Sequence, residues 1–181
     1  MFQQELTILS SIVSNKRLEH CLRVANTAKE IAKQHNYDEN EAFLCGLLHD
    51  CAKEIEIGKY DIEFSENDMK FYSEFNEIWH AFVVEKVGAY FFPMHNLNIF
   101  KAAKFHSTGA KSMSLLAKII FVSDYIEPGR SYIQDSALKD LAFVDLNKAV
   151  FEVAQKKLHY LVTKKQKIHH YLFECYNFYQ S

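Results

Sequence analysis

Residues that interrupt helices are scarce in this chain, and this scarcity limits the folds that it can adopt. Only five of its 181 residues are glycine and two are proline, whereas a fold of many short strands needs such residues at its turns. Apolar residues also recur with the period of an α-helix along most of the sequence. We therefore expect an all-α fold. The sequence contains no repeat, low-complexity segment or linker-like stretch, so we expect a single domain over residues 1–181.

Two of the expected helices are marked by good N-cap residues. Ser14 precedes the amphipathic segment 15–36, and Asp38 precedes the segment 39–54. The second segment becomes apolar on all sides, so we expect it to lie at the centre of the fold. The polar and irregular segment 58–69 predicts a loop. Further helices are expected at residues 76–92, 96–106, 114–126, 146–165 and 167–180.

The charge and cysteine content of the chain indicate its cellular compartment and exclude some classes of partner. The formal net charge of −2 gives no sign of the strongly basic face that binds nucleic acid. No apolar segment approaches the roughly 18 residues that suggest a membrane span, and residues 1–14 lack the features of a signal peptide. Four cysteines without a CxxC pattern suit buried free thiols. We expect a cytoplasmic protein with no nucleic-acid or membrane partner.

Four histidines lie inside or at the end of apolar helical segments. Taken singly, such a histidine is more often a satisfied core or surface residue than a metal ligand. His80 follows Trp79, and packing against that ring is an alternative role for this histidine. The four are His20, His49, His80 and His106. Only as a set do they indicate a binding site.

Asp124 strengthens this interpretation because it interrupts the apolar run "KIIFVSDYI". Aspartate is almost never fully buried unless it is paired or coordinates a metal. The nearby cations Lys118 and Arg130 are expected on another face and beyond a turn, respectively. A shared metal ion would satisfy Asp124, Asp50 and the histidines together, and this donor set suits iron, manganese or zinc.

The segment "GLLHDCAKE" brings the expected chemistry together. His49 and Asp50 diverge by roughly 100° on a helix, so they would reach one ion from neighbouring faces. Asp50 could bind the ion through one oxygen and accept a proton from water through the other. Lys53 lies one turn after His49, and Arg17 lies one turn before His20. Both could reach a phosphate at the metal, although a snorkelling surface role is the alternative.

The order His20, His49-Asp50, Asp124 resembles the H…HD…D signature of the HD-superfamily metal-dependent phosphohydrolases. Five segments together are similar to its bacterial YqeK-type branch, the symmetrical diadenosine-tetraphosphate hydrolases. These segments are "RLEHCLRVANTAKEIA", "GLLHDCAKE", "WHAFVVEKVGAY", "KFHSTGAKSMSLLAKIIFVSDYIEPGR" and "DLNKAV". The resemblance covers nearly the whole chain, and the fourth segment is the most specific.

This resemblance implies an HD-domain helical bundle that cleaves diadenosine tetraphosphate into two nucleoside diphosphates with a divalent metal, iron above all, as one ion or two. The implied metal ligands are His20, His49, Asp50 and Asp124. The implied catalytic residues are Asp50, Lys53, His80 and His106. Implied substrate contacts are Arg17, His20, Asp50, Lys53, His80, His106, Ser107, Asp124, Arg130, Ile168 and His169.

Two departures from the family pattern concern the substrate rather than the metal. The family's "HTTG" is "HSTG" here, and Ser107 keeps the hydroxyl. The Pro and Thr that usually follow the Ile168-His169 pair are absent, which weakens base recognition there. Another nucleotide, deoxynucleotide or cyclic, is an alternative substrate, and a non-catalytic nucleotide-binding module is an alternative function. The sequence is silent on oligomeric state, so a homodimer stays open.

Overall fold

The computed structural model describes residues 2–130 and 136–180, and within them the chain forms nine α-helices and no strand. The all-α prediction is confirmed. The helices are α1 (Gln3–Ile12), α2 (Asn15–Gln34), α3 (Glu39–Leu48), α4 (Glu66–Phe91), α5 (Leu97–Ala103), α6 (Leu115–Ile126), α7 (Ser136–Val144), α8 (Leu146–Thr163) and α9 (His170–Tyr179). No helix in these ranges is both long enough and apolar enough to span a bilayer.

Short polar side chains begin several helices where the sequence predicts them. The hydroxyl of Ser14 accepts a hydrogen bond from the amide of Arg17 at the start of α2. The carboxylate of Asp38 accepts from the amides of Asn40 and Glu41 at the start of α3. Such caps satisfy amide groups that have no partner within the helix. They define where α2 and α3 begin, and thereby which residues face each other.

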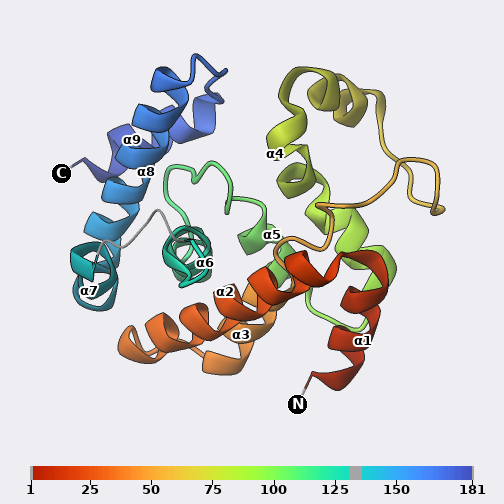
Figure 1. Ribbon diagram of the computed structural model, residues 1–181, viewed down its shortest axis with the longest axis horizontal. Coiled ribbons are helices and arrows are strands. Elements are labelled where there is room, and N and C mark those ends of the chain that lie inside the picture. The colour runs from red at the N-terminus through yellow and green to blue at the C-terminus, as the bar shows by residue number, and fades with distance from the viewer. Residues whose placement is uncertain (1, 131–135, 181) are drawn as a thin grey trace.

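α6 is the central helix of the fold and is seen almost end-on in Figure 1, between the α2–α3 pair and α8. Apolar side chains cover nearly all of its surface, and even its Ser123 and Asp124 are buried. A helix that is apolar all round needs neighbours on every side. α2, α3, α5, α7 and α8 supply them. Asp124 is therefore presented from the middle of the protein and not from its surface.

α2 and α3 approach each other closely because residue 46 is glycine. A Cβ atom at Gly46 would lie 2.8 Å from the Cα of Ala25, closer than real carbon contacts allow. The two backbones can touch only where one residue has no side chain. This contact brings the end of α3 up to the middle of α2, and so brings His49 towards His20.

Several predicted boundaries are wrong. α3 ends at Leu48, and residues 49–54 form turns that carry the His-Asp pair. α4 starts ten residues before the expected helix because Ser65 and Asp68 form a capping box, which overrides the polar character of the segment. The irregular residue Phe75 (φ −140°, ψ 49°) then bends α4. Helices α1 and α7 were not predicted.

Candidate metal centre

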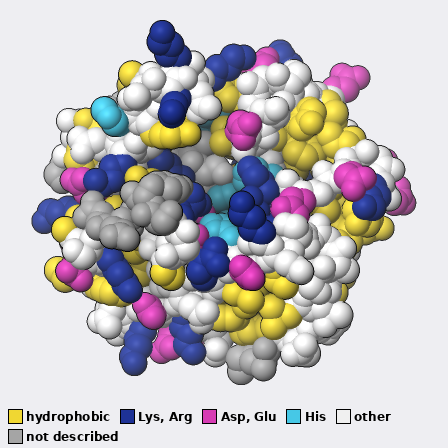
Figure 2. All heavy atoms as spheres, viewed as in Figure 1, with side chains coloured by type: hydrophobic (Ala, Val, Ile, Leu, Met, Phe, Trp, Pro, Cys, Tyr) yellow, Lys and Arg dark blue, Asp and Glu magenta, His cyan; other side chains and the backbone are white. Residues whose placement is uncertain are grey.

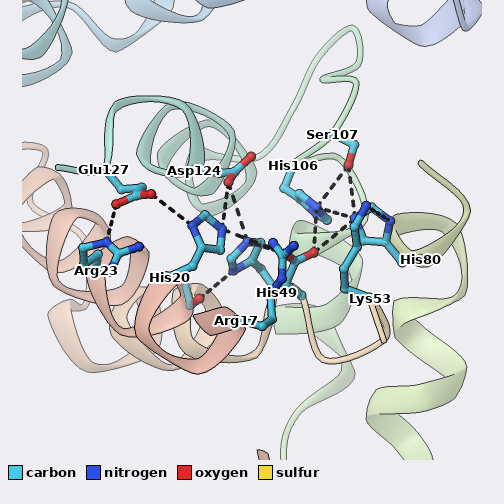
Figure 3. Close-up of polar contacts among 12 residues, drawn as sticks. Arg17, His20, Arg23, His49, Lys53, His80, His106, Ser107, Asp124 and Glu127 are labelled. Atoms are coloured by element: carbon cyan, nitrogen blue, oxygen red, sulfur yellow. Dashed lines mark hydrogen bonds and ion pairs between the residues drawn. The ribbon is translucent and has the colours of Figure 1, made fainter. Parts of the chain in front are cut away.

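Six polar side chains from five parts of the chain lie close together between α2, α4 and α6, and five of them are labelled in Figure 3. They come from α2, the turn after α3, α4, the turn after α5, and α6. All six are buried, none more than 8% exposed. They are His20, His49, Asp50, His80, His106 and Asp124. The structure thus collects all the histidines and both carboxylates that the sequence singled out for a metal site.

The first cluster contains the four predicted metal ligands. Nε2 of His20 lies 3.2 Å from Oδ1 of Asp124 and 3.9 Å from Oδ2 of Asp50. Nε2 of His49 lies 3.8 Å from the same two oxygens. Two ring nitrogens and two carboxylates therefore surround one small volume.

The second cluster joins the first through Asp50. Oδ1 of Asp50 lies 3.1 Å from Nε2 of His80 and 3.3 Å from Nε2 of His106. The two imidazole nitrogens lie 3.0 Å apart. One carboxylate therefore faces both clusters. Two groups of three residues are close enough together to hold an ion, namely His20, His49 and Asp50, and Asp50, His80 and His106.

Hydrogen bonds on the far side of three rings decide which nitrogen faces the centre. Nδ1 of His49 donates to the carbonyl of Gly46 (2.7 Å), and Nδ1 of His106 donates to the carbonyl of Ala103 (2.8 Å). Nδ1 of His20 donates to Oε1 of Glu127 (3.1 Å). In each neutral ring the proton therefore resides on Nδ1, and the Nε2 lone pair is directed at the centre.

The centre is consequently rich in acceptors and poor in donors. Among the described residues, Nε2 of His20, Nε2 of His49 and Oδ1 of Asp50 are buried without a hydrogen-bond partner. Leaving such groups unsatisfied costs about 1–3 kcal/mol each. A divalent cation in the first cluster would satisfy the two imidazole nitrogens, while Oδ1 of Asp50 faces the second cluster. Imidazole with carboxylate suits borderline ions such as iron, manganese or zinc, so the residues present fit a metal.

The protonation states of the histidines and carboxylates also favour a metal site. Burial lowers the pKa of His49 to about 3 and that of His80 to about 4, so both rings are neutral at physiological pH. Burial opposes ionisation of Asp124, but Arg130 and His20 hold the pKa of this carboxyl well below its usual range. The pKa of Asp50 is lowered likewise, against burial, by the surrounding imidazoles. Neutral rings and ionised carboxylates are the forms that bind metals.

Glu127 supports the centre from behind, and the sequence reasoning missed it. Besides Nδ1 of His20, its carboxylate accepts from Nε of Arg23 (2.6 Å) and from the amide of Gly129 (2.6 Å). A carboxylate behind a ligating histidine fixes the orientation of the ring and raises its basicity. The signal in the sequence was its position, because Glu127 is a second acidic residue, three residues after Asp124, directly after an apolar helix.

Two arginines pair with the two carboxylates, and one of these pairs corrects the sequence argument. Nη1 of Arg17 lies 2.7 Å from Oδ2 of Asp50. Arg130, expected too far beyond a turn, donates from Nη2 to Oδ1 of Asp124 (2.6 Å) and from Nε to its carbonyl (2.7 Å). The amide of Arg130 bonds to the carbonyl of Glu127, and this tight turn returns the guanidinium to α6. Asp124 therefore does not lack a protein cation.

Two lysines hold parts of the centre in place. Nζ of Lys53 donates to the carbonyl of Glu77 (3.0 Å) and lies 3.3 Å from Nδ1 of His80. Nζ of Lys157, on α8, donates to the carbonyls of His106 (3.1 Å) and Ser107 (3.0 Å). Burial lowers the pKa of Lys157 to about 8.

Lys157 was missed by the sequence reasoning, although the sequence holds a signal for it. It lies three and four residues after Ala154 and Val153, which are fully buried, so this lysine falls on the apolar stripe of α8. A lysine on such a stripe needs acceptors inside the protein. The carbonyls of His106 and Ser107 are those acceptors.

Two cavities open beside the centre, and Ser107 lines both. The aromatic cavity (about 220 Å³) is bordered by Phe75, Lys167 and His169. The cationic cavity (about 340 Å³) is bordered by Asp124, Arg130, Lys156, Lys157 and Tyr160. The hydroxyl of Ser107 lies 3.0 Å from Nε2 of His106, at the junction of cavities and centre.

The two predicted substrate contacts in the C-terminal segment differ in their placement. His169 is buried against Phe71 and Phe75 and faces the aromatic cavity. Its neighbour Ile168 packs against the hydrophobic core instead. The structure therefore brings His169, but not Ile168, to the wall of that cavity.

The approach to the centre is electropositive. Figure 2 shows a hollow near the middle of one face, with histidine side chains at its bottom and Lys and Arg side chains around its rim. An anionic ligand, such as a polyphosphate, suits it.

Comparison with known proteins places this geometry in context. A family model described as "HD domain" matches residues 17–129, more than half of the chain. A Staphylococcus aureus protein named "Bis(5'-nucleosyl)-tetraphosphatase, symmetrical" is 32% identical over 171 residues, which cover 91% of this chain and 87% of that protein. A protein of the same name from Halalkalibacterium halodurans is 31% identical, over 95% of this chain and 93% of its own length.

A solved structure agrees with the fold over almost the full length. It is a crystal structure from Clostridium acetobutylicum, described as a predicted HD superfamily hydrolase involved in NAD metabolism. It superposes with a TM-score of 0.81 at 28% identity and covers 99% of this chain and 97% of that one.

Proposed function

This chain belongs to the HD domain family, and on that premise we propose that it hydrolyses diadenosine tetraphosphate symmetrically, yielding two molecules of ADP. The names of its relatives support the substrate and the symmetry of the cut. The reaction consumes one water and breaks the central phosphoanhydride bond. The products of any other cut are unequal, so the products alone identify the activity.

The observation that carries this proposal is the position of Asp50 in both histidine clusters. Its two oxygens face His20 and His49 on one side and His80 and His106 on the other. A carboxylate between two sets of imidazoles is suited to a phosphohydrolase centre with one ion or two. The cationic rim suits a substrate that carries four phosphates.

The proposed metal is iron, held by His20, His49, Asp50 and Asp124, with His80 and His106 available to a second ion. The donor set of imidazoles and carboxylates supports a borderline divalent ion, and the family resemblance supports iron among them. A bound ion would polarise a phosphoryl oxygen and acidify water. The identity of the ion is tested by elemental analysis of protein purified without chelator.

The residues of the chain divide the remaining tasks. Arg17 and Arg130 pair with the carboxylates of Asp50 and Asp124, respectively. When substrate binds, their guanidinium groups would lie beside its phosphates. The charge of Lys53, 3.3 Å from Nδ1 of His80, helps to keep that ring neutral. The hydroxyl of Ser107 can donate to a phosphate oxygen at the junction of the two cavities. Asp50 is the proposed proton acceptor for the attacking water.

The test is a product analysis with a matched control. Metal-loaded protein is incubated with diadenosine tetraphosphate, and the nucleotides are separated by anion-exchange chromatography. We expect ADP alone from the unmodified chain, and a loss of at least about 100-fold in Asp50→Asn. Asp140→Asn, on the exposed face of α7, should behave like the unmodified chain. AMP with ATP, or no turnover with any divalent ion, would contradict the proposal.

Further expectations about the whole molecule belong to the same proposal. We propose that residues 1–181 work as one domain, in the cytoplasm, with a nucleotide as the small-molecule partner. A homodimer is the proposed assembly, and light scattering of the purified protein measures it directly. A measured molar mass equal to that of one chain would exclude the dimer, and it would not contradict the proposed reaction.

A further inference from the structure

Residues 104–114 form the loop that joins α5 to α6, and this loop carries His106 and Ser107. The amide of Gly109 donates to the carbonyl of Phe105 (2.7 Å) and closes a turn around these two residues. The loop lies outside the helices, so it needs support from its neighbours to keep one shape. The positions of His106 and Ser107 at the centre therefore depend on what holds the loop.

Two helices that pack against each other, α8 and α9, run beside this loop in Figure 1. From α8, the ammonium of Lys157 donates to the carbonyls of His106 (3.1 Å) and Ser107 (3.0 Å). From α9, Cys175 and Tyr179 contact the loop farther along the chain. The last helix of the structure is thus joined to the loop that completes the centre.

The thiol of Cys175 packs against the loop at Gly109, which has a positive φ of 63°. A Cβ atom at Gly109 would lie 2.5 Å from Sγ of Cys175 and 3.2 Å from Cζ of Phe121, so the bare glycine is enclosed between α9 and α6. Burial raises the pKa of Cys175 to about 12, and the backbone amide of Ala110 opposes this rise. The neutral sulfur is therefore a close packing contact for the turn.

The side chain of Tyr179 holds the far end of the loop. The amide of Met113 donates to the phenol oxygen of Tyr179 (3.1 Å), and the contact is buried. Met113 directly precedes Ser114, the N-cap of α6, so this bond defines where the loop enters the helix. Without the phenol oxygen, a buried amide would lose its acceptor, which is unfavourable.

We propose that Tyr179 is a positioning residue for the reaction, because it holds through Met113 the loop that places His106 and Ser107 at the centre. Cys175 supports the same loop at Gly109. The effect on turnover rests on the proposed function, whereas the effect on the loop does not. Since a small displacement of reacting groups lowers the rate of a reaction, loss of the bond should act mainly on kcat.

The test removes one atom from Tyr179. In Tyr179→Phe, hydrogen–deuterium exchange of residues 104–114 should be about fivefold faster, the factor that corresponds to loss of one neutral hydrogen bond. Exchange in α2 and α3 should stay the same. For diadenosine tetraphosphate, kcat should fall about fivefold, with KM within about twofold.

The matched control is Tyr176→Phe, which removes the same atom from the same helix. The ring of Tyr176 stacks on Phe151 of α8 at 5.1 Å, and its hydroxyl makes no hydrogen bond to the loop, all of which the structure describes. This variant should leave the exchange of the loop, kcat and KM unchanged. A change shared by both variants would assign the effect to α9 as a whole and overturn the role of Tyr179.

A double variant tests whether Tyr179 acts through the loop. In a Ser107→Ala background, Tyr179→Phe should lower kcat by a smaller factor than it does in the unmodified chain, because the two residues act in one unit. Cys175→Ala, which removes the sulfur beside Gly109, should also quicken exchange in the loop.

Unchanged exchange of the loop in Tyr179→Phe would overturn the inference, as would faster exchange with an unchanged kcat. Fully independent effects of Tyr179→Phe and Ser107→Ala on kcat would overturn it as well. If the unmodified chain does not hydrolyse diadenosine tetraphosphate, the proposed function fails. The exchange measurement needs no substrate, so it still decides whether Tyr179 holds the loop.

Discussion

The carboxylate of Glu127 accepts the Nδ1 proton of His20 across 3.1 Å and so joins the C-terminal end of α6 to the middle of α2. The same carboxylate is held by Arg23 and by the amide of Gly129, so its position is defined from three sides. His20 has little freedom to turn its Nε2 away from the centre. Metal binding should therefore depend on a residue that does not touch the metal.

Glu127→Gln should lower metal affinity about 10- to 100-fold, which is typical for loss of a carboxylate behind a ligating histidine. The amide keeps the shape of the side chain but removes the charge that raises the basicity of His20. Competition with a fluorescent chelator measures the affinity. Glu19→Gln, an exposed residue on α2, is the control. Unchanged affinity in Glu127→Gln would show that His20 needs no such support.

Lys157→Met should lower kcat about tenfold or more and destabilise the fold by about 1–3 kcal/mol. The carbonyls of His106 and Ser107 would lose their donor and stay half-buried without a partner. Denaturant unfolding and steady-state kinetics measure the two effects. Lys157→Arg should recover part of both, whereas Lys164→Met at the exposed end of α8 should change neither. A normal kcat in Lys157→Met would mean that the turn at residue 106 holds itself in place.

Gly46→Ala should destabilise the protein by about 1–3 kcal/mol and also weaken metal binding. The new methyl group would meet backbone atoms of Ala25 and force α2 and α3 apart. Because His20 and His49 lie on these two segments, the fold and the site should suffer together. Thermal unfolding with and without Mn²⁺ measures both. Asn40→Ala, exposed on α3, should leave both unchanged.

The metal-free protein should lose stability as pH falls from about 6.5 towards 4. Burial lowers the pKa of His49 to about 3 and of His80 to about 4 in the folded state, below the unfolded value near 6.5. In this window the unfolded chain binds more protons, so acid favours unfolding. His20, with a raised pKa, contributes mainly above pH 6.5, where its stabilisation is lost as pH rises.

Urea unfolding at several pH values in the presence of chelator measures this dependence. His80→Gln should flatten it, because one of the two depressed imidazoles is gone. His159→Gln, exposed on α8, should leave the slope as it is. Stability that is constant over this range would argue that the rings are already charged in the folded state.

Much of the candidate site could be predicted because its polar side chains stand out against apolar helices. His20, His49, His80, His106 and Asp124 lie within or beside the hydrophobic stretches that had to be buried, so their convergence followed from the helical pattern. The all-α fold followed from the same pattern and from the scarcity of turn residues. What the sequence could not give was the neighbourhood of each residue.

Arg130, Glu127 and Lys157 show why. The turn that returns Arg130 to Asp124 depends on one backbone hydrogen bond, which periodicity does not predict. Glu127 matters because α2 lies opposite it, and Lys157 because α8 passes under the turn at residue 106. These relationships are set by how helices pack across long separations in sequence. The early start of α4 was missed for a local reason, since its capping box lies in a polar segment.

The position of Asp50 between two imidazole pairs has a consequence for the order and affinity with which metal ions would bind. Two divalent ions bound on either side of this one carboxylate would repel each other. The first ion therefore weakens the attraction for the second, and loading should be anticooperative, with two separate steps in a titration. By reciprocity, whatever occupies one pair adjusts the affinity of the other. With two ions, the centre would behave as one linked unit and not as two independent sites.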